Sequence, residues 1–291
     1  MHAPIKAFVS FVSLCACLVP LAVTAAVAPG DPDVAFGSDH TGVVSTALPN
    51  QYLEAHALAV QQDGRIVVAG QVCSDSTGQD CSIAIERLTS DGTLDDTFNN
   101  SGNTPGLLTG LGLIGNDNHA QAVEVTAEGL IVVAGYTCAA GQCSFLLLRL
   151  LPDGSPDTTF GDGGRFVPVN AGTGTTATAQ AAALALQPDG RMLLAGFSNA
   201  GTDSTGHDSP THDDFTLMRY YTNTVDRGFP LNGDGSGIVT IDFTHNDDHV
   251  NAVALQPDGK IVAAGETCAL NSGGCSFAVA RFNSDGTLDD G

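Results

Sequence analysis

Residues 62–70 read QDGRIVVAG, and this phrase returns as AEGLIVVAG at 127–135, PDGRMLLAG at 188–196 and PDGKIVAAG at 257–265. Each copy is a tight turn followed by a short apolar strand that a glycine ends. A second strand precedes each turn, at 57–60, 122–125, 183–186 and 252–255. The sequence therefore predicts four β-hairpins, repeated about every 65 residues.

A third apolar strand follows each hairpin, at 83–88, 145–150, 215–220 and 277–282. It runs into an Asp-Gly turn in three units, whereas the third unit carries Asn223 at this position. A phrase that ends in Phe98, Phe160 or Phe229 comes next, and a weaker fourth strand follows it, as at 164–169 and 237–243. Four short antiparallel strands per unit, with no helical periodicity, predict an all-β fold, a β-propeller of four four-stranded blades.

The chain starts and stops within a unit. Residues 31–37 (DPDVAFG) match the middle of a unit, as at 155–161 (SPDTTFG), and residues 285–291 stop close to that point. We therefore expect units of roughly 38–98, 99–160, 161–229 and 230–291, with 31–37 completing the last unit. The N-terminal strand would then close the ring and leave no free sheet edge. The alternatives are an open β-repeat array or a fragment of a larger propeller.

These motifs resemble the bacterial delta-60 repeat, a β-propeller-type domain of undefined function. Residues 256–265 (QPDGKIVAAG) and 153–161 (DGSPDTTFG) fit its signature closely, and the resemblance covers residues 31–291. The resemblance implies a secreted or surface-associated repeat protein, and it supplies no catalytic residues.

Residues 1–28 have the pattern of a signal peptide, with Lys6, an apolar run at 7–18 and small residues at 23–28. The run is too short to span a membrane comfortably, and no later stretch approaches ~20 apolar residues. We expect a periplasmic or secreted domain over 29–291 without a transmembrane anchor. Lipidation at Cys17 is disfavoured, because Cys15 is a poor residue two positions before a lipidated cysteine.

The charge is strongly negative, with 32 acidic residues against 10 basic ones. Most of the acids are aspartates, which favour turns. The negative surface repels phosphate backbones, so nucleic acid is not expected as a partner. A protein or carbohydrate partner remains, and the sequence does not indicate an oligomeric state.

Eight cysteines are present, and Cys15 and Cys17 leave with the signal peptide. The other six form close pairs, which predict loop disulfides in an exported chain: Cys73 with Cys81, Cys138 with Cys143, and Cys268 with Cys275. A metal site would need four converging thiolates or a tighter mixture of cysteine and histidine.

The third unit has no cysteine pair in this loop and carries a longer polar stretch at 199–214. Two imidazoles and several carboxylates in one loop could hold a divalent ion. The candidate metal ligands are Asp203, His207, Asp208, His212, Asp213 and Asp214. A solvated polar loop is the simpler interpretation, and no other cofactor is expected.

Arginine recurs in register as Arg87, Arg149, Arg219 and Arg281. A ring of four arginines would suggest an anion site in the channel. A residue that recurs in every unit more often stabilises the repeat, so we favour a structural pair with nearby aspartates.

Two functional interpretations follow. The favoured one is an exported, non-catalytic scaffold or recognition module, because repeat proteins place function in variable loops. The alternative is an extracellular metal-assisted hydrolase or glycan-active enzyme. It would need titratable residues from different blades to converge at the channel mouth. The sequence shows polar residues that recur at one position of the unit, Glu54, His119, Gln180 and His249, but not that they converge. A second polar cluster, Asp242, His245, Asp247, Asp248 and His249, is best explained as turn and strand-start residues.

Overall fold

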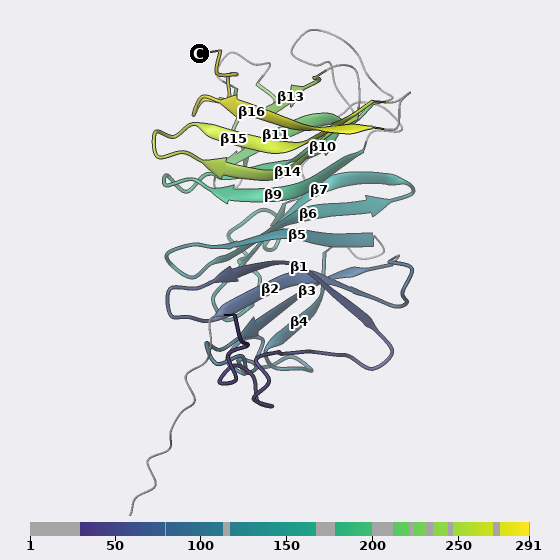
Figure 1. Cartoon of the computed structure of the whole chain (residues 1–291), viewed down its shortest axis with the longest axis vertical. Helices are drawn as coiled ribbons and strands as arrows, with labels where there is room; N and C mark the ends of the chain where they lie inside the picture. Colours follow the sequence, from purple (N-terminus) through teal and green to yellow (C-terminus); the bar gives the residue numbers. More distant parts are fainter. Residues whose placement is uncertain are drawn as a thin grey trace, which may run out of the picture.

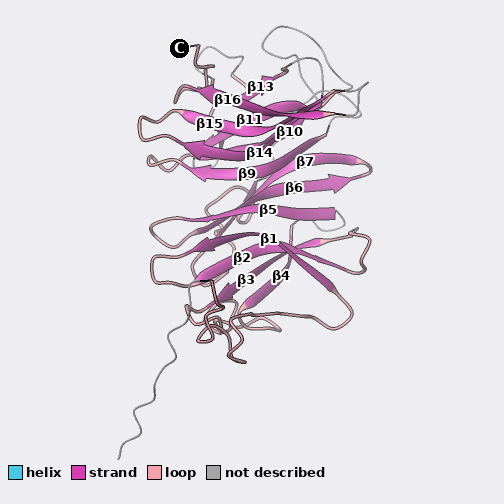
Figure 2. Ribbon diagram, in the orientation of Figure 1, coloured by secondary structure: helices cyan, strands magenta, loops and turns pink. Residues whose placement is uncertain are grey.

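The structure is a computed structural model that describes residues 30–78, 80–112, 117–166, 178–199, 212–221, 224–230, 235–243, 247–269 and 274–290. These residues form antiparallel β-sheets and no helix (Figure 2), which confirms the all-β prediction. In this part of the chain there is accordingly no helix long and apolar enough to cross a membrane. The predicted signal peptide lies outside the described residues.

The first two sheets each have four strands in chain order. The first holds β1 (Tyr52–Val60), β2 (Ile66–Cys73), β3 (Ser82–Leu88) and β4 (Leu107–Leu111). The second holds β5 (Asp117–Val125), β6 (Ile131–Ala139), β7 (Gln142–Leu150) and β8 (Arg165–Phe166). In both sheets the fourth strand, which follows the phenylalanine phrase, pairs with the third strand. The first sheet thus extends past residue 98.

The last two sheets depart from four strands. The third holds β9 (Ala179–Leu186), β10 (Met192–Ser198) and β11 (Asp214–Tyr221), and both β12 (Thr224–Val225) and β13 (Ile238–Ile241) pair with β11. The fourth holds β14 (Asp247–Leu255), β15 (Ile261–Cys268) and β16 (Cys275–Phe282). Within the described residues no fourth strand pairs with β16.

The four sheets are stacked along the long axis of the molecule, from β1–β4 at one end to β14–β16 at the other (Figure 1). We call the face of a sheet that points toward the next unit its front face, and the opposite face its back face. Each apolar core lies between two sheets. The first core, for example, packs Ile83 and Ile85 on a front face against Val123 and Ile131 on the next back face. Unit boundaries are therefore where most of the apolar surface is buried.

The glycine that ends each apolar phrase is required by a bulge in the neighbouring first strand. The register shifts opposite Gly70, Gly135, Gly196 and Gly265. A Cβ atom on Gly135 would come within 1.9 Å of the carbonyl oxygen of His119, and the other three glycines face equivalent carbonyls. Only glycine lets the bulged strand approach this closely.

Each recurring arginine pairs with the aspartate of the phenylalanine phrase. Arg87 Nε lies 2.7 Å from Asp95 Oδ2, and its guanidinium lies 4.8 Å from the centre of the Phe98 ring. The other units repeat the ion pair as Arg149–Asp157, Arg219–Asp226 and Arg281–Asp289. We call each such ion pair a clasp. The arginines therefore form the structural pairs that we favoured from the sequence.

The clasps also join neighbouring units. Arg87 donates to the carbonyl oxygen of Pro152, and Arg219 Nη1 donates to that of Ser284 over 2.6 Å. Both acceptors lie in the Asp-Gly turn of the next unit. The Phe98 ring also covers the glycine of that turn, because a Cβ on Gly154 would come within 2.7 Å of it. The aromatic phrase of one unit thus caps the turn of the next.

The N-terminal segment follows the same rule and contacts the first unit. Gly37 N donates to the carbonyl oxygen of Asp91 over 2.7 Å, and a Cβ on Gly92 would come within 2.9 Å of the Phe36 ring. In Figure 1 this segment and β14–β16 lie at opposite ends of the molecule. A phrase that caps the turn of the first unit can still belong to the unit before it, as Phe98 of the first unit caps Gly154 of the second. Completion of the last unit by 31–37 therefore stays a prediction. The closed four-bladed ring stays a prediction.

The three predicted disulfides are present. Cys73 bonds Cys81, Cys138 bonds Cys143, and Cys268 bonds Cys275. Each closes the loop between the second and third strands of its sheet. The sequence separations of 8, 5 and 7 residues make them local staples of a hairpin.

Candidate functional site

Polar and aromatic side chains follow one another across the unit boundaries, near the bulge of each first strand. Each first strand contributes one residue, and its cross-strand partner stands on the second strand directly after the phrase-ending glycine. We call this set the polar row. Its pairs are Glu54 with Gln71, His119 with Tyr136, Gln180 with Phe197, and His249 with Glu266. The row contains the register that the sequence indicated, together with four partners that it did not.

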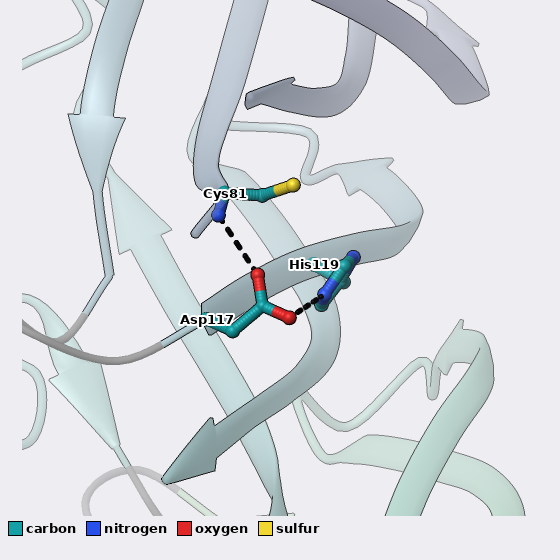
Figure 3. A group of neighbouring side chains, drawn as sticks. All are labelled: Cys81, Asp117 and His119. Atoms are coloured by element: carbon teal, nitrogen blue, oxygen red, sulfur yellow. Dashed lines mark hydrogen bonds and ion pairs between the residues drawn. The ribbon is translucent and has the colours of Figure 1, made fainter. Parts of the chain in front are cut away.

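His119 lies at the boundary between the first two units and is only 7% exposed. Its Nε2 lies 3.0 Å from Asp117 Oδ2, while Asp117 Oδ1 accepts a hydrogen bond from Cys81 N over 2.8 Å (Figure 3). Its Nδ1 contacts Gln71 Oε1 of the preceding unit, and its ring stacks on Tyr136 with centroids 4.6 Å apart. Both ring nitrogens of His119 are therefore engaged.

Cys81, Asp117 and His119 bring potential metal-ligand atoms within 4.8 Å of one another. The sulfur of Cys81 is bonded to Cys73, so it cannot act as a thiolate ligand. The remaining carboxylate and imidazole are paired with each other. This group fits a brace between two units better than a metal centre.

His249 occupies the equivalent position at the boundary between the third and fourth units. Its Nε2 lies 3.0 Å from Asp213 Oδ2, and its ring centre lies 4.3 Å from that of Phe197. The hydrogen bond with Asp213 holds the pKa of His249 above its ordinary value, although burial works against this. Charged His249 is thus stabilised by a carboxylate of the preceding unit.

Asp213 stands where the other units have the second cysteine of the disulfide. It lies six residues before Arg219, as Cys81, Cys143 and Cys275 lie six residues before their own arginines. The ion pair between Asp213 and His249 replaces a covalent link inside one unit by a charged link between two units.

Three carboxylates gather beside this ion pair. Asp214, Asp242 and Asp248 bring carboxylate oxygens within 4.8 Å of one another, and Asp248 is fully buried. Burial raises the pKa of Asp248, as does the charge of Asp242, while the Thr267 hydroxyl and the Phe243 amide lower it. Oxygen-only donors suit calcium better than zinc. The cluster could hold a divalent cation, and it is the one place among the described residues where three carboxylates meet in this way.

The predicted metal ligands of the third unit divide into two groups. Asp203, His207 and Asp208 lie outside the described residues. Asp213 pairs with His249, whereas Asp214 belongs to the carboxylate cluster. His212 is half-buried, and its Nδ1 has no hydrogen-bond partner among the described residues. The metal site predicted for this loop stays a prediction. The sequence assigned Asp242 and Asp248 to a turn, because their partner Asp214 comes from another unit.

Parts of three units match a known family. A family model described as "Domain of unknown function (DUF5122) beta-propeller" matches residues 61–98, 129–160 and 256–291. These three segments are similar to that β-propeller family. The matched segments contain the hairpin phrase or the clasp of three units, and the finer assignment to the delta-60 repeat stays a prediction. No curated protein matches the chain.

Solved structures show a partial likeness in shape to this chain. A protein of unknown function from Dyadobacter fermentans has 15% identity and a TM-score of 0.45, with 83% of this chain and 72% of that chain covered. An α-L-arabinanase from Cellvibrio cellulosa, solved with arabinohexaose, has 12% identity and a TM-score of 0.43, with 80% and 76% covered. Likeness at this level carries no argument about function.

Proposed function

We propose that the protein is a non-catalytic recognition or scaffold module that works in the periplasm or outside the cell. The observation that supports this most is the state of the two histidines of the polar row. His119 has both ring nitrogens engaged, and His249 has its Nε2 engaged by Asp213 and its Nδ1 4.0 Å from Glu266 Oε1. A general base or a metal ligand needs a free nitrogen. These side chains brace one unit against the next.

Export is supported by the chemistry of the loops and by the leader pattern. Three disulfides staple the described hairpins, and disulfides persist in oxidising compartments. The partner would be a protein or a carbohydrate, since a net charge of −22 disfavours polyanions.

A metal-assisted hydrolase is the second candidate, and one observation favours it. The cluster of Asp214, Asp242 and Asp248 places three carboxylates at a unit boundary, and a divalent ion held there could activate water.

The two functions are separated by one set of assays. The protein is run through native gels that contain arabinan or another neutral polysaccharide, and release of reducing sugar is measured with calcium or zinc added. If the protein is a recognition module, at least one polymer should slow its migration in the gel, and no sugar should be released. Sugar release that Asp248→Asn abolishes, while Asp258→Asn in an exposed turn leaves it intact, would establish the hydrolase instead.

A further inference from the structure

The last unit exposes a front face whose equivalents are buried in every other unit. Phe277 is 99% exposed and Val279 is 61% exposed. Register aligns Phe277 with Ile83, Phe145 and Phe215, which are at most 1% exposed. Val279 aligns in the same way with Ile85, Leu147 and Leu217, which are fully buried. Inside the chain these residues pack against the back face of the next unit.

The first unit exposes a back face in the same manner. Leu58 and Val60 are each 64% exposed. Three residues align with Leu58: Val123 and Leu184 are only 5% and 6% exposed, and Val253 is partly buried, because a front face covers each of them. The two exposed faces are therefore the two halves of one interface, which the chain makes between its neighbouring units.

The clasp of the last unit lacks its inter-unit contact. Arg87 and Arg219 donate to turn carbonyls of the following unit, and their side chains are 6% and 9% exposed. The Arg281 side chain is 47% exposed, and among the described residues it contacts only Asp289. A following unit would supply the missing carbonyl.

The N-terminal segment has the register of a fourth strand. A glycine with positive φ opens each fourth strand, and two residues after Gly106, Gly164 and Gly237 stand Leu108, Phe166 and Val239, which pair with Ile85, Leu147 and Leu217. Gly42 is the equivalent glycine, because its amide donates to the Phe36 carbonyl as that of Gly106 donates to Phe98. Two residues after Gly42 stands Val44, and the residue equivalent to Ile85, Leu147 and Leu217 is Val279 on β16. Residues 44–46 already lie over the back face of the first unit, where they line a cavity of about 300 Å³ with Leu53, Val68 and Glu86. This segment therefore has the register to pair with the free edge of β16.

We propose that the front face of the last unit binds the back face of the first unit of a second copy, whose N-terminal segment pairs with β16. The two surfaces lie at opposite ends of one molecule (Figure 1), so a second copy can reach them without rearranging the fold. Two copies of four units make eight blades, which is within the usual range of propellers. The contact is head-to-tail, and such a contact closes into a ring only when the rotation between copies brings the second front face onto the second back face. A series of larger polymers in place of a dimer would contradict the two-copy ring.

Sedimentation velocity and light scattering on the full purified protein test this assembly. The wild type is expected to be a dimer, whereas Phe277→Asp and Leu58→Asp are each expected to be monomeric. Both side chains are exposed in the single chain, so circular dichroism and the melting temperature of the monomer should stay unchanged. Leu151→Asp changes an exposed leucine (37% exposed) in a turn of the second unit, and it should leave the dimer intact.

Mixing the two variants gives the decisive result. Phe277→Asp keeps an intact back face and Leu58→Asp keeps an intact front face, so an equimolar mixture should recover a 1:1 heterodimer through one intact junction. A monomeric wild type, a dimer that either variant leaves intact, or a mixture that stays monomeric would each overturn the proposal. If Phe277→Asp does not fold, Val279→Lys tests the same face.

Discussion

Replacing Asp95 by asparagine should cost far more stability than the same replacement of an aspartate at the surface. The Asp95 carboxylate is 3% exposed and lies 2.7 Å from Arg87 Nε and 2.9 Å from Arg65 Nε. It also accepts hydrogen bonds from the amide and the hydroxyl of Thr97. Asparagine keeps the shape and removes the charge, which leaves Arg87 buried without a counter-ion. Breaking a buried pair in this way costs about 3–5 kcal/mol.

The other acids supply a graded comparison. Asp157 faces one arginine instead of two cations, and the side chain of Arg149 is 16% exposed, so Asp157→Asn should cost less. Asp63 pairs with Arg65 at the surface, with half of its side chain exposed, so Asp63→Asn should cost much less than either buried change. Urea unfolding followed by far-ultraviolet circular dichroism suits a chain without tryptophan.

The pH dependence has a defined sign. Burial raises the pKa of Asp95, but the Thr97 hydrogen bonds and the Arg87 charge together hold it below its ordinary value. The stability difference between wild type and Asp95→Asn should therefore be complete above about pH 4 and shrink as the pH falls further through the folded-state pKa. If Asp95→Asn costs no more than Asp63→Asn at neutral pH, the clasp does not stabilise the repeat.

Three further predictions concern the glycine, the staples and the metal. Gly135→Ala should destabilise by about 1–3 kcal/mol or more, because its Cβ would overlap the His119 carbonyl, whereas Gly274→Ala, with no atom within 4 Å, should have little effect in the same melt. Intact-mass analysis of the exported protein should show six hydrogens gained on reduction and no reactive thiol before it, while a reactive thiol in the native protein would contradict the three staples. If the loop at 199–214 binds a transition metal, zinc should raise the melting temperature, EDTA should lower it, and His207→Ala with His212→Ala should remove the response; identical melting in zinc and in EDTA would leave it a solvated loop.

The repeat and its hairpins could be predicted from the sequence because each signal is local. An Asp-Gly turn, an apolar run and a closing glycine lie within nine residues, and the three cysteine pairs lie within single loops. The relation between Gly135 and the bulge at His119 could not be predicted, because it depends on the approach of two backbones. Closure could not be predicted either. Residues 31–37 have the correct motif, but this motif predicts only which turn Phe36 caps. Closure also depends on how the stack of sheets curves, and the sequence does not show that.

The candidate site was predicted in part for the same reason. The register of His119 and His249 follows from the repeat, whereas Gln71 and Phe197 occupy a position that varies from unit to unit. Asp213 could have been found by counting back from Arg219 to the position of the cysteines. The cluster of Asp214 and Asp248 gave no sequence signal, because 34 residues and a unit boundary separate the two carboxylates.

The matched terminal faces are tested most directly by a disulfide trap. Val44→Cys and Val279→Cys are introduced into one chain, at positions that the register makes direct partners when the N-terminal segment pairs with β16. Such partners lie about 4.5–5.5 Å apart between Cα atoms, which a disulfide can bridge. Mild oxidation should give a covalent dimer on a non-reducing gel, and neither single variant should give one. A cross-link within one monomer would show that the chain closes its own ring, and the absence of any cross-link would show that the two faces do not meet.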